Sequence, residues 1–209
     1  MPLYKTISIN EFTTAYFWHI TEDVTSLFRA VSLKDTSLFR LEGMKSVAHQ
    51  QGFLAVRMLL QHLGYTDYDL SYDELGKPHL MDGKQVSISH SHEFSCICIS
   101  EVIIGIDIEK CKEKTLKIAP RFLEIKHLDH LSTSDQITKA TIIWGIKESI
   151  FKIKNEVGIS FPQHIFEDEF NLTDGKCTAS LHFNNQIENF NIQFYNVEEY
   201  IFVCAFPKK

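Results

Sequence analysis

Apolar residues recur at helical spacing over one long stretch of the first half of the chain. From Ser37 to Leu63 they return every three or four positions, as they do in an amphipathic helix. Gly64 follows directly, and glycine commonly marks the end of a helix. The pattern therefore predicts one helix over this stretch, the longest of the first half.

A second helical pattern lies in the other half. Thr133 and Gln136 have the spacing of a capping box, which predicts that a helix begins there. A stripe of isoleucines then recurs at helical spacing before Gly158. We expect this stripe to be buried: Ile143, Ile146, Ile150 and Ile153.

β-Branched and aromatic residues predict strands in most remaining segments. One strand is expected within Lys5 to Ile20. After a turn-like segment, three strands are expected as an antiparallel meander: Val86 to His90, Phe94 to Ser100 and Val102 to Glu109. Further strands are expected in the last third: Phe166 to Leu172, Ala179 to Phe183, Phe190 to Tyr195 and Tyr200 to Phe206. Both halves thus run from a long helix into strands. This order predicts an α+β fold of two pseudo-symmetric halves, residues 1–101 and 102–209, each a long helix packed on a small, mostly antiparallel sheet.

The composition is that of a globular protein, with 44% hydrophobic and 23% charged residues. A net charge of −6 argues against general nucleic-acid binding, which needs a dense basic surface. No apolar run approaches the ~20 residues of a transmembrane helix, and the N-terminus lacks the layout of a secretory signal. The five cysteines are scattered through apolar runs, as free thiols are. We therefore expect a cytoplasmic protein that binds neither nucleic acid nor membrane.

Two acidic residues share one face of an otherwise apolar strand. Alternation along Ile104 to Glu109 sends the isoleucines to one face and Gly105, Asp107 and Glu109 to the other. Two carboxylates this close repel each other, so a cation is the natural means of keeping both ionised. Gly105 is expected to leave space beside them. An edge strand with a solvated polar face is the alternative explanation.

The second helix carries charges among large apolar residues. Between Trp144 and Lys152, the side chains of Glu148 and Lys152 are four positions apart and share a face. An exposed ion pair is the ordinary explanation, and such pairs are worth only about 0.3–0.5 kcal/mol. The apolar neighbours favour a different one, because charges without a task are uncommon on a buried helix.

Four motifs together resemble the 4'-phosphopantetheinyl transferase family, in particular its larger, two-half monomeric type. They are GKPHL from Gly76, SISHS from Ser87, IGIDIEK from Ile104 and WGIKESIFK from Trp144, and they follow the family's order. The resemblance implies transfer of 4'-phosphopantetheine from coenzyme A to a serine of an apo acyl or peptidyl carrier protein, with release of 3',5'-ADP. It also implies an active site at the interface of the halves, with the coenzyme A nucleotide on the N-terminal half and the metal and catalytic helix in the C-terminal half.

The resemblance implies that three carboxylates hold Mg²⁺, with Mn²⁺ as an alternative ion: Asp107, Glu109 and Glu148. Mg²⁺ prefers such oxygen ligands and usually shares its shell with water and substrate phosphate. Lys152 would stabilise the leaving group, and Glu148, directly or through a metal-bound water, would accept the serine proton. Lys147 is expected to be structural and to pair with a nearby carboxylate, and Trp144 to belong to the core.

Contacts to coenzyme A are implied for Lys152 and for a set of residues in the first half: Arg40, Gly76, Lys77, Pro78, Ser89 and His90. A lysine beside a proline-stiffened turn, and a hydroxyl and imidazole at a strand end, are suitable phosphate donors. The alternatives are an exposed helix residue for Arg40 and a backbone-bonded histidine for His90.

Two positions depart from the family's pattern. Gln51 stands where relatives sometimes have a basic residue, which leaves recognition of the 3'-phosphate open; Arg57 either compensates or packs the helix. His92 replaces the glycine or small residue that often follows SHS, and it either crowds the nucleotide or points outward.

The implied partner is an acidic carrier of fatty-acid, polyketide or nonribosomal peptide synthesis, bound by a monomeric enzyme. Docking of an acidic partner is steered by a basic patch. The chain offers four candidate cations for such a patch: Arg121, Lys126, Lys139 and Lys154.

Two other functions fit parts of the sequence. A metal-dependent hydrolase would use His90 and His92 with Asp107 as a third ligand, and the segment from His127 to His130 offers a similar pair. This explanation accounts for neither the GKP motif nor the lysine–carboxylate helix. A non-catalytic homologue that only binds carrier proteins is the second alternative, and the intact acids argue against it.

Overall fold

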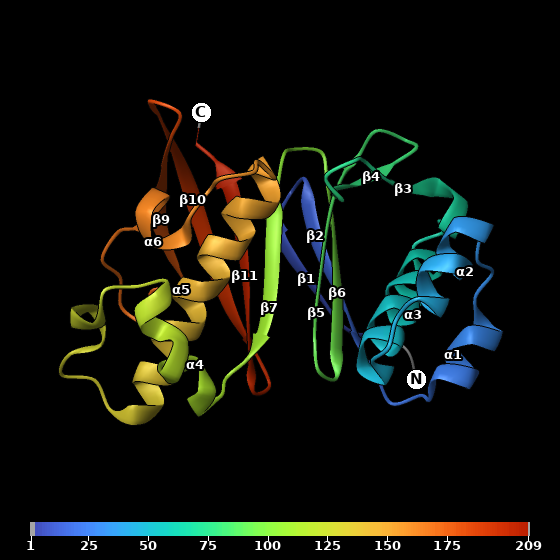
Figure 1. Cartoon of the computed structure of the whole chain (residues 1–209), viewed down its shortest axis with the longest axis horizontal. Helices are drawn as coiled ribbons and strands as arrows, with labels where there is room; N and C mark the ends of the chain where they lie inside the picture. Colours follow the sequence, from blue (N-terminus) through green and yellow to red (C-terminus); the bar gives the residue numbers. More distant parts are fainter. Residues whose placement is uncertain (1–2, 209) are drawn as a thin grey trace. The chain divides into compact units, whose positions relative to one another are not determined.

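A computed structural model describes residues 3–208, which fall into two compact units that divide between Val102 and Ile103 (Figure 1). Each unit combines helices with antiparallel strands, so the predicted α+β class is confirmed. None of the helices within residues 3–208 is long and apolar enough to cross a membrane.

The first unit contains a four-stranded antiparallel sheet in the order β1-β2-β6-β5. Its strands are β1 (Leu3–Asn10), β2 (Thr13–His19), β5 (Gln85–Ser91) and β6 (Phe94–Ser100). The expectation of one strand in the opening segment is wrong, because a tight turn divides it into a hairpin. The side-chain oxygen of Asn10 accepts a hydrogen bond from the Phe12 amide at 2.9 Å, and such local bonds favour turns.

The first unit also contains three helices, of which one packs on the sheet. They are α1 (Val24–Ala30), α2 (Asp35–Glu42) and α3 (Val47–His62), and α3 packs on β2, β5 and β6. The expectation of one helix from Ser37 to Leu63 is wrong, because α2 ends at Glu42 with Gly43 as its C-cap, and α3 begins anew with Ser46 as its N-cap. Glycine has a low helix propensity, and serine is preferred at N-caps. A 3₁₀ turn η1 (Asp67–Asp69) and a hairpin of β3 (Leu70–Tyr72) and β4 (Pro78–Leu80) complete the unit.

The second unit contains a five-stranded antiparallel sheet in the order β7-β11-β10-β9-β8. Its strands are β7 (Gly105–Lys110), β8 (Ile165–Glu167), β9 (Lys176–Phe183), β10 (Gln186–Val197) and β11 (Tyr200–Pro207). The expected meander holds for β5 and β6 only. β7 pairs instead with β11, where Asp107 lies opposite Val203. Ile106 and Ile108, the apolar side chains of β7, are fully buried.

One long helix, α5 (Thr133–Lys154), lies over β7 and β11 (Figure 1). Its N-cap is Ser132 rather than Thr133, and the Ser132 hydroxyl accepts a hydrogen bond from the Asp135 amide at 3.2 Å. The predicted isoleucine stripe is fully or almost fully buried, as expected. Short elements precede and follow α5: α4 (Glu113–Ile118), η2 (Ala119–Arg121), η3 (Ile125–Leu128) and α6 (Phe161–His164).

Candidate functional site

The backbones of β7 and α5 approach each other closely in the second unit. A Cβ atom at Gly105 would lie 1.9 Å from the carbonyl oxygen of Ser149, so no side chain fits there. On the helix, a Cβ at Gly145 would lie 2.6 Å from Cγ2 of Val203. The space that the sequence predicted beside Gly105 is therefore filled by the backbone of α5. These two glycines bring a turn of α5 against the acidic face of β7.

Asp107 lies under α5 and is almost completely buried, with 4% of its surface exposed. Nζ of Lys152 donates hydrogen bonds to Oδ1 of Asp107 and to the carbonyl oxygen of Ile106, each at 2.9 Å. The Lys152 side chain is 28% exposed. The alternative explanation for the two acids was an edge strand with a solvated polar face. Asp107 is buried, so this explanation does not apply to it.

Glu148 stands one helical turn before Lys152 and is half-buried. Burial raises the pKa of the Glu148 carboxyl, and the nearby Asp107 carboxylate raises it further, while Lys152 opposes the shift. The influence of Asp107 on Glu148 connects an acid of β7 with an acid of α5, and their joint role in a metal site stays a prediction. A carboxyl group with a raised pKa is a stronger base than an ordinary glutamate, which suits proton abstraction.

Glu109 follows Asp107 on the same face of β7 and is half-buried. Within residues 3–208, no group of three or more His, Cys, Asp or Glu side chains is arranged so that it could hold a metal ion. Mg²⁺ does not require such a group, because one or two carboxylates commonly hold it together with water and substrate phosphate. The Asp107 and Glu148 carboxylates meet that requirement, and their mutual repulsion favours a cation between them.

Lys147 has the structural role that the sequence suggested. Its side chain is 3% exposed, and its Nζ lies 2.8 Å from Oε2 of Glu167 on β8. Burial lowers the pKa of Lys147, and the Glu167 carboxylate opposes the shift. The other oxygen of Glu167 lies 3.2 Å from Nδ1 of His127, in η3. Trp144 is half-buried at the edge of the core, in edge-on contact with Phe122 and Phe161.

The GKP motif forms the turn between β3 and β4 in the first unit. Oδ1 of Asp73 accepts hydrogen bonds from the amides of Leu75 and Lys77, at 3.0 and 2.9 Å. Gly76 has a φ of +81°, which favours glycine. Lys77 and Pro78 are half-buried, and Gly76 is exposed. The turn therefore holds the Lys77 backbone in one conformation.

Ser89 and His90 lie near the end of β5. Ser89 is buried, and the exposed His90 ring rests on α3, where a Cβ at Gly52 would lie 3.1 Å from Cγ of His90. The ring of His49 lies 5.9 Å away between centroids. His92 is exposed in the turn after β5, with a φ of 49°. Because Gly52 has no side chain, the His90 imidazole can pack directly against the backbone of α3.

The three remaining positions of the first unit differ in their surroundings. Arg40 is exposed in the last turn of α2, with its guanidinium carbon 4.8 Å from the centroid of Tyr72. The Gln51 side chain donates to the carbonyl oxygen of Glu22 at 2.8 Å. Arg57 is 3% exposed and forms an ion pair of 2.9 Å with Asp67, so it packs the helix.

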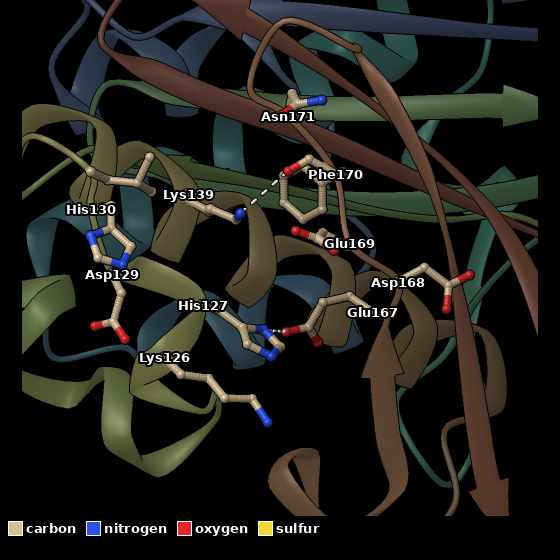
Figure 2. A pocket seen from close by; sticks show the side chains of 11 residues that line it. Lys126, His127, Asp129, His130, Lys139, Glu167, Asp168, Glu169, Phe170 and Asn171 are labelled. Atoms are coloured by element: carbon tan, nitrogen blue, oxygen red, sulfur yellow. Dashed lines mark hydrogen bonds and ion pairs between the residues drawn. The ribbon is translucent and has the colours of Figure 1, made fainter.

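The histidines offered for a hydrolase do not form a metal site. Zinc takes three or more protein ligands, and residues 3–208 hold no such group. His127 and His130 instead line a pocket of about 600 Å³ beside α5, whose wall includes the contact between His127 and Glu167 (Figure 2). Lys139 in the same wall donates to the carbonyl oxygen of Phe170 at 3.2 Å.

Glu167 is the one member of this arrangement that the sequence did not single out. It belongs to an acidic run that looks solvated, yet its side chain is 5% exposed while the neighbouring Phe166 is 41% exposed. Alternation along β8 was the available signal, because it places Glu167 on the same side as the buried Ile165.

The chain is similar in sequence to known proteins. The family model described as the 4'-phosphopantetheinyl transferase superfamily matches residues 103–204, which include all of β7 and α5. The chain is 31% identical over 147 residues to the 4'-phosphopantetheinyl transferase Sfp of Bacillus subtilis (strain 168), covering 66% of this chain and 65% of that protein.

Two further relatives have the same activity in their names. The transferase gsp of Aneurinibacillus migulanus is 34% identical over 107 residues, covering 48% of this chain and 45% of that protein. The transferase ffp of Bacillus subtilis is 29% identical over 170 residues, covering 77% and 75%. The chain thus matches just under two thirds of the length of Sfp and less than half of gsp. The chain is therefore similar to the 4'-phosphopantetheinyl transferase superfamily over residues 103–204, and to named transferases over as much as 77% of its length.

Proposed function

We propose that this protein transfers the 4'-phosphopantetheine group of coenzyme A to a serine of an apo carrier protein, with Mg²⁺ as the metal and 3',5'-ADP as the second product. One structural observation supports the proposal in addition to the sequence similarity. The buried Asp107 of β7 meets Lys152 and Glu148 of α5, and these are the groups that a diphosphate-binding metal site with a neighbouring base requires.

Asp107 and Glu148, with Glu109 beside them, are the proposed metal-holding residues. When bound, Mg²⁺ offsets the charge of the diphosphate and polarises the phosphorus that is attacked. Mn²⁺ has the same preference for oxygen ligands and is the natural substitute. Without a cation, the carboxylates repel coenzyme A, so binding of coenzyme A is expected to depend on the metal.

Side chains of the protein carry out the other steps of the transfer. The serine oxygen forms a bond to the pantetheine-side phosphorus, and the bond from this phosphorus to the oxygen of the departing 3',5'-ADP breaks. Glu148 accepts the serine proton. Lys152 moves from Asp107 to the phosphate and stabilises the charge that develops on the leaving group.

Contacts to the rest of coenzyme A are proposed for residues of the first unit. Lys77 and His90 supply cationic or hydrogen-bonding groups for the phosphates, with Gly76, Pro78 and Ser89 shaping the segments that hold them. Exposed Arg40 is the proposed cation for the nucleotide end. Gln51 stands where a basic residue could bind the 3'-phosphate. Arg57 is not proposed to take over that role, because its guanidinium group is buried in an ion pair with Asp67.

Acidic carrier proteins are the proposed partners, and the segment between β7 and α5 offers a local surface of the opposite sign. Five cations of residues 112–126 are exposed: Lys112, Lys114, Lys117, Arg121 and Lys126. Only Glu113 and Glu124 oppose them within that range. Of the four cations that the sequence suggested, Lys126 is paired with Glu124, while Lys139 and Lys154 are engaged by Phe170 and Glu188. Such a surface speeds the encounter with an acidic partner despite the net charge of −6.

Mass spectrometry of apo acyl, peptidyl and aryl carrier proteins tests the proposal. Each carrier is incubated with the protein, coenzyme A and Mg²⁺, and we expect a carrier to gain the mass of phosphopantetheine with an equal amount of 3',5'-ADP. Omission of Mg²⁺ with a chelator should stop the reaction. Carriers that stay unmodified while the protein binds them would favour a non-catalytic homologue instead.

A further inference from the structure

One carboxylate ties three elements of the second unit together. Oε2 of Glu167, on β8, lies 2.8 Å from Nζ of Lys147 on α5, and Oε1 lies 3.2 Å from Nδ1 of His127 in η3. The Lys147 ammonium also donates to the carbonyl oxygen of Ile165 at 2.5 Å. Figure 2 shows that the contact of Glu167 with His127 lies in the wall of the pocket beside α5.

The interior position of Glu167 is unusual for its residue type. Its partners across the sheet are apolar: Ala179 lies opposite Glu167, and Leu181 lies opposite Ile165. The strand turns Phe166 outward and the glutamate inward. Buried ion pairs are weak stabilisers, because removing two charges from water offsets most of their attraction. A well-packed apolar pair would stabilise the fold as well, so stability alone does not account for this bridge.

The bridge is placed where it controls the direction of the proposed catalytic side chains. Lys147 directly precedes Glu148, and successive residues of an α-helix differ by about 100° around its axis. Holding Lys147 against β8 therefore adds a restraint on the rotation of α5 to that of the close packing at Gly105 and Gly145, and with it on the directions of Glu148 and Lys152. Groups behind metal ligands commonly orient those ligands in this way.

We propose that Glu167 is a positioning residue that, through its bridge to Lys147 and His127, holds α5 in the rotation that aims Glu148 and Lys152 at Asp107. The inference rests on the proposed function, because it concerns the same acidic site. It assigns Glu167 no contact with substrate or metal. His127 acts as the outer support, with 34% of its side chain exposed to the pocket.

The test replaces the whole ion pair by apolar residues, in the double variant Lys147→Met/Glu167→Leu. Such a replacement commonly leaves a fold as stable as before, so we expect a melting temperature within a few degrees of wild type. We expect the affinity for Mn²⁺ in the presence of coenzyme A, measured from the EPR signal of free Mn²⁺, to fall by about 10–100-fold. The kcat of transfer should fall by a similar factor, about 10–100-fold, while the KM for the carrier protein stays nearly constant.

A matched control removes another ion pair of the same helix. Glu188→Gln breaks the contact of Glu188 with Lys154, which is 2.6 Å long, and should leave Mn²⁺ affinity and kcat unchanged. A folded double variant with wild-type Mn²⁺ affinity and kcat would overturn the positioning role.

A single variant covers the case in which the double variant does not fold. Glu167→Gln keeps the shape of the side chain, and it should weaken Mn²⁺ affinity and lower kcat by about tenfold at an unchanged KM for the carrier; wild-type values would refute the inference. If wild-type protein neither binds Mn²⁺ with coenzyme A nor transfers the group, the proposed function itself fails and the inference with it.

Discussion

The long helices of the two units pack on similar sheets and carry opposite chemistry. α3 contains no acidic residue, and its contacts with the sheet include the Gly52 carbonyl, which accepts a hydrogen bond from Ser95 at 3.1 Å, and the ring of His90. α5 presents Glu148 and Lys152 next to the buried Asp107. One architecture, a helix on an antiparallel sheet, thus carries an acidic centre in one unit and none in the other, depending on a few side chains.

Both helices also bury one cation, and the two cations differ in what surrounds them. Arg57 on α3 is held by Asp67, by the carbonyl oxygen of Phe53 at 3.3 Å and by the Phe53 ring, 3.5 Å from its guanidinium carbon. Lys147 on α5 directly precedes Glu148. Loss of the first is therefore expected to affect folding, and loss of the second to affect the site.

The largest expected effect comes from the acidic centre of the second unit. Glu148→Gln removes the proposed base and a metal ligand, and we expect the kcat of transfer to fall by about 10²–10⁴-fold. The measurement is the rate of holo-carrier formation by mass spectrometry, with the fold checked by circular dichroism. Gln61→Ala, on an exposed position of α3, is the control and should be without effect. A folded Glu148→Gln protein with full activity would show that Glu148 of α5 takes no part in the transfer reaction.

Removal of the buried cation of α3 should act on stability instead. Arg57→Met leaves the Asp67 carboxylate buried without its partner, and breaking such a pair costs about 3–5 kcal/mol of unfolding free energy. Urea denaturation measures this change. At a temperature where the variant is folded, its KM for coenzyme A should equal that of wild type. A raised KM with unchanged stability would mean that Arg57 contacts the nucleotide after all.

The donor groups of the first unit should affect binding more than turnover. Lys77→Met and His90→Gln each remove one proposed phosphate contact, and we expect the KM for coenzyme A to rise about tenfold, equivalent to about 1.4 kcal/mol. The kcat at saturating coenzyme A should stay within about threefold of wild type. Lys84→Met, an exposed lysine of the same unit, serves as the control. A fall in kcat equal to the fall in kcat/KM in both variants would mean that Lys77 and His90 stabilise the transition state rather than bind coenzyme A in the ground state.

The smallest expected effect concerns the metal-free protein. Because the pKa of Glu148 is higher in the folded protein than its ordinary value of 4.5, ionisation of this group destabilises the folded state. The contribution is absent below the ordinary pKa and grows as pH rises through the raised pKa. In a chelator, Glu148→Gln should therefore melt at a higher temperature than wild type at neutral pH, and the gap should close near pH 4. A gap that is independent of pH would assign the difference to packing.

Local pattern was a good guide to which side chains share a face. Alternation placed Asp107 and Glu109 together on β7, and helical spacing placed Glu148 and Lys152 together on α5. It was a poor guide to where elements break. Gly43 interrupted a predicted helix, and the turn near Asn10 interrupted a predicted strand, because single-residue turn chemistry outweighed an otherwise continuous apolar pattern.

By itself the sequence determined the resemblance to the transferase family, the α+β class and the acid and lysine motifs, because these depend on residue types and short spacings. Tertiary structure decided that β7 joins β11 rather than β6, that the backbone of α5 fills the space beside Gly105, and that Glu167 turns inward to meet Lys147. The physical reason is that strand pairing and the partners of buried charges depend on contacts between residues far apart in the chain. Periodicity defines the face of an element, and packing determines what that face meets.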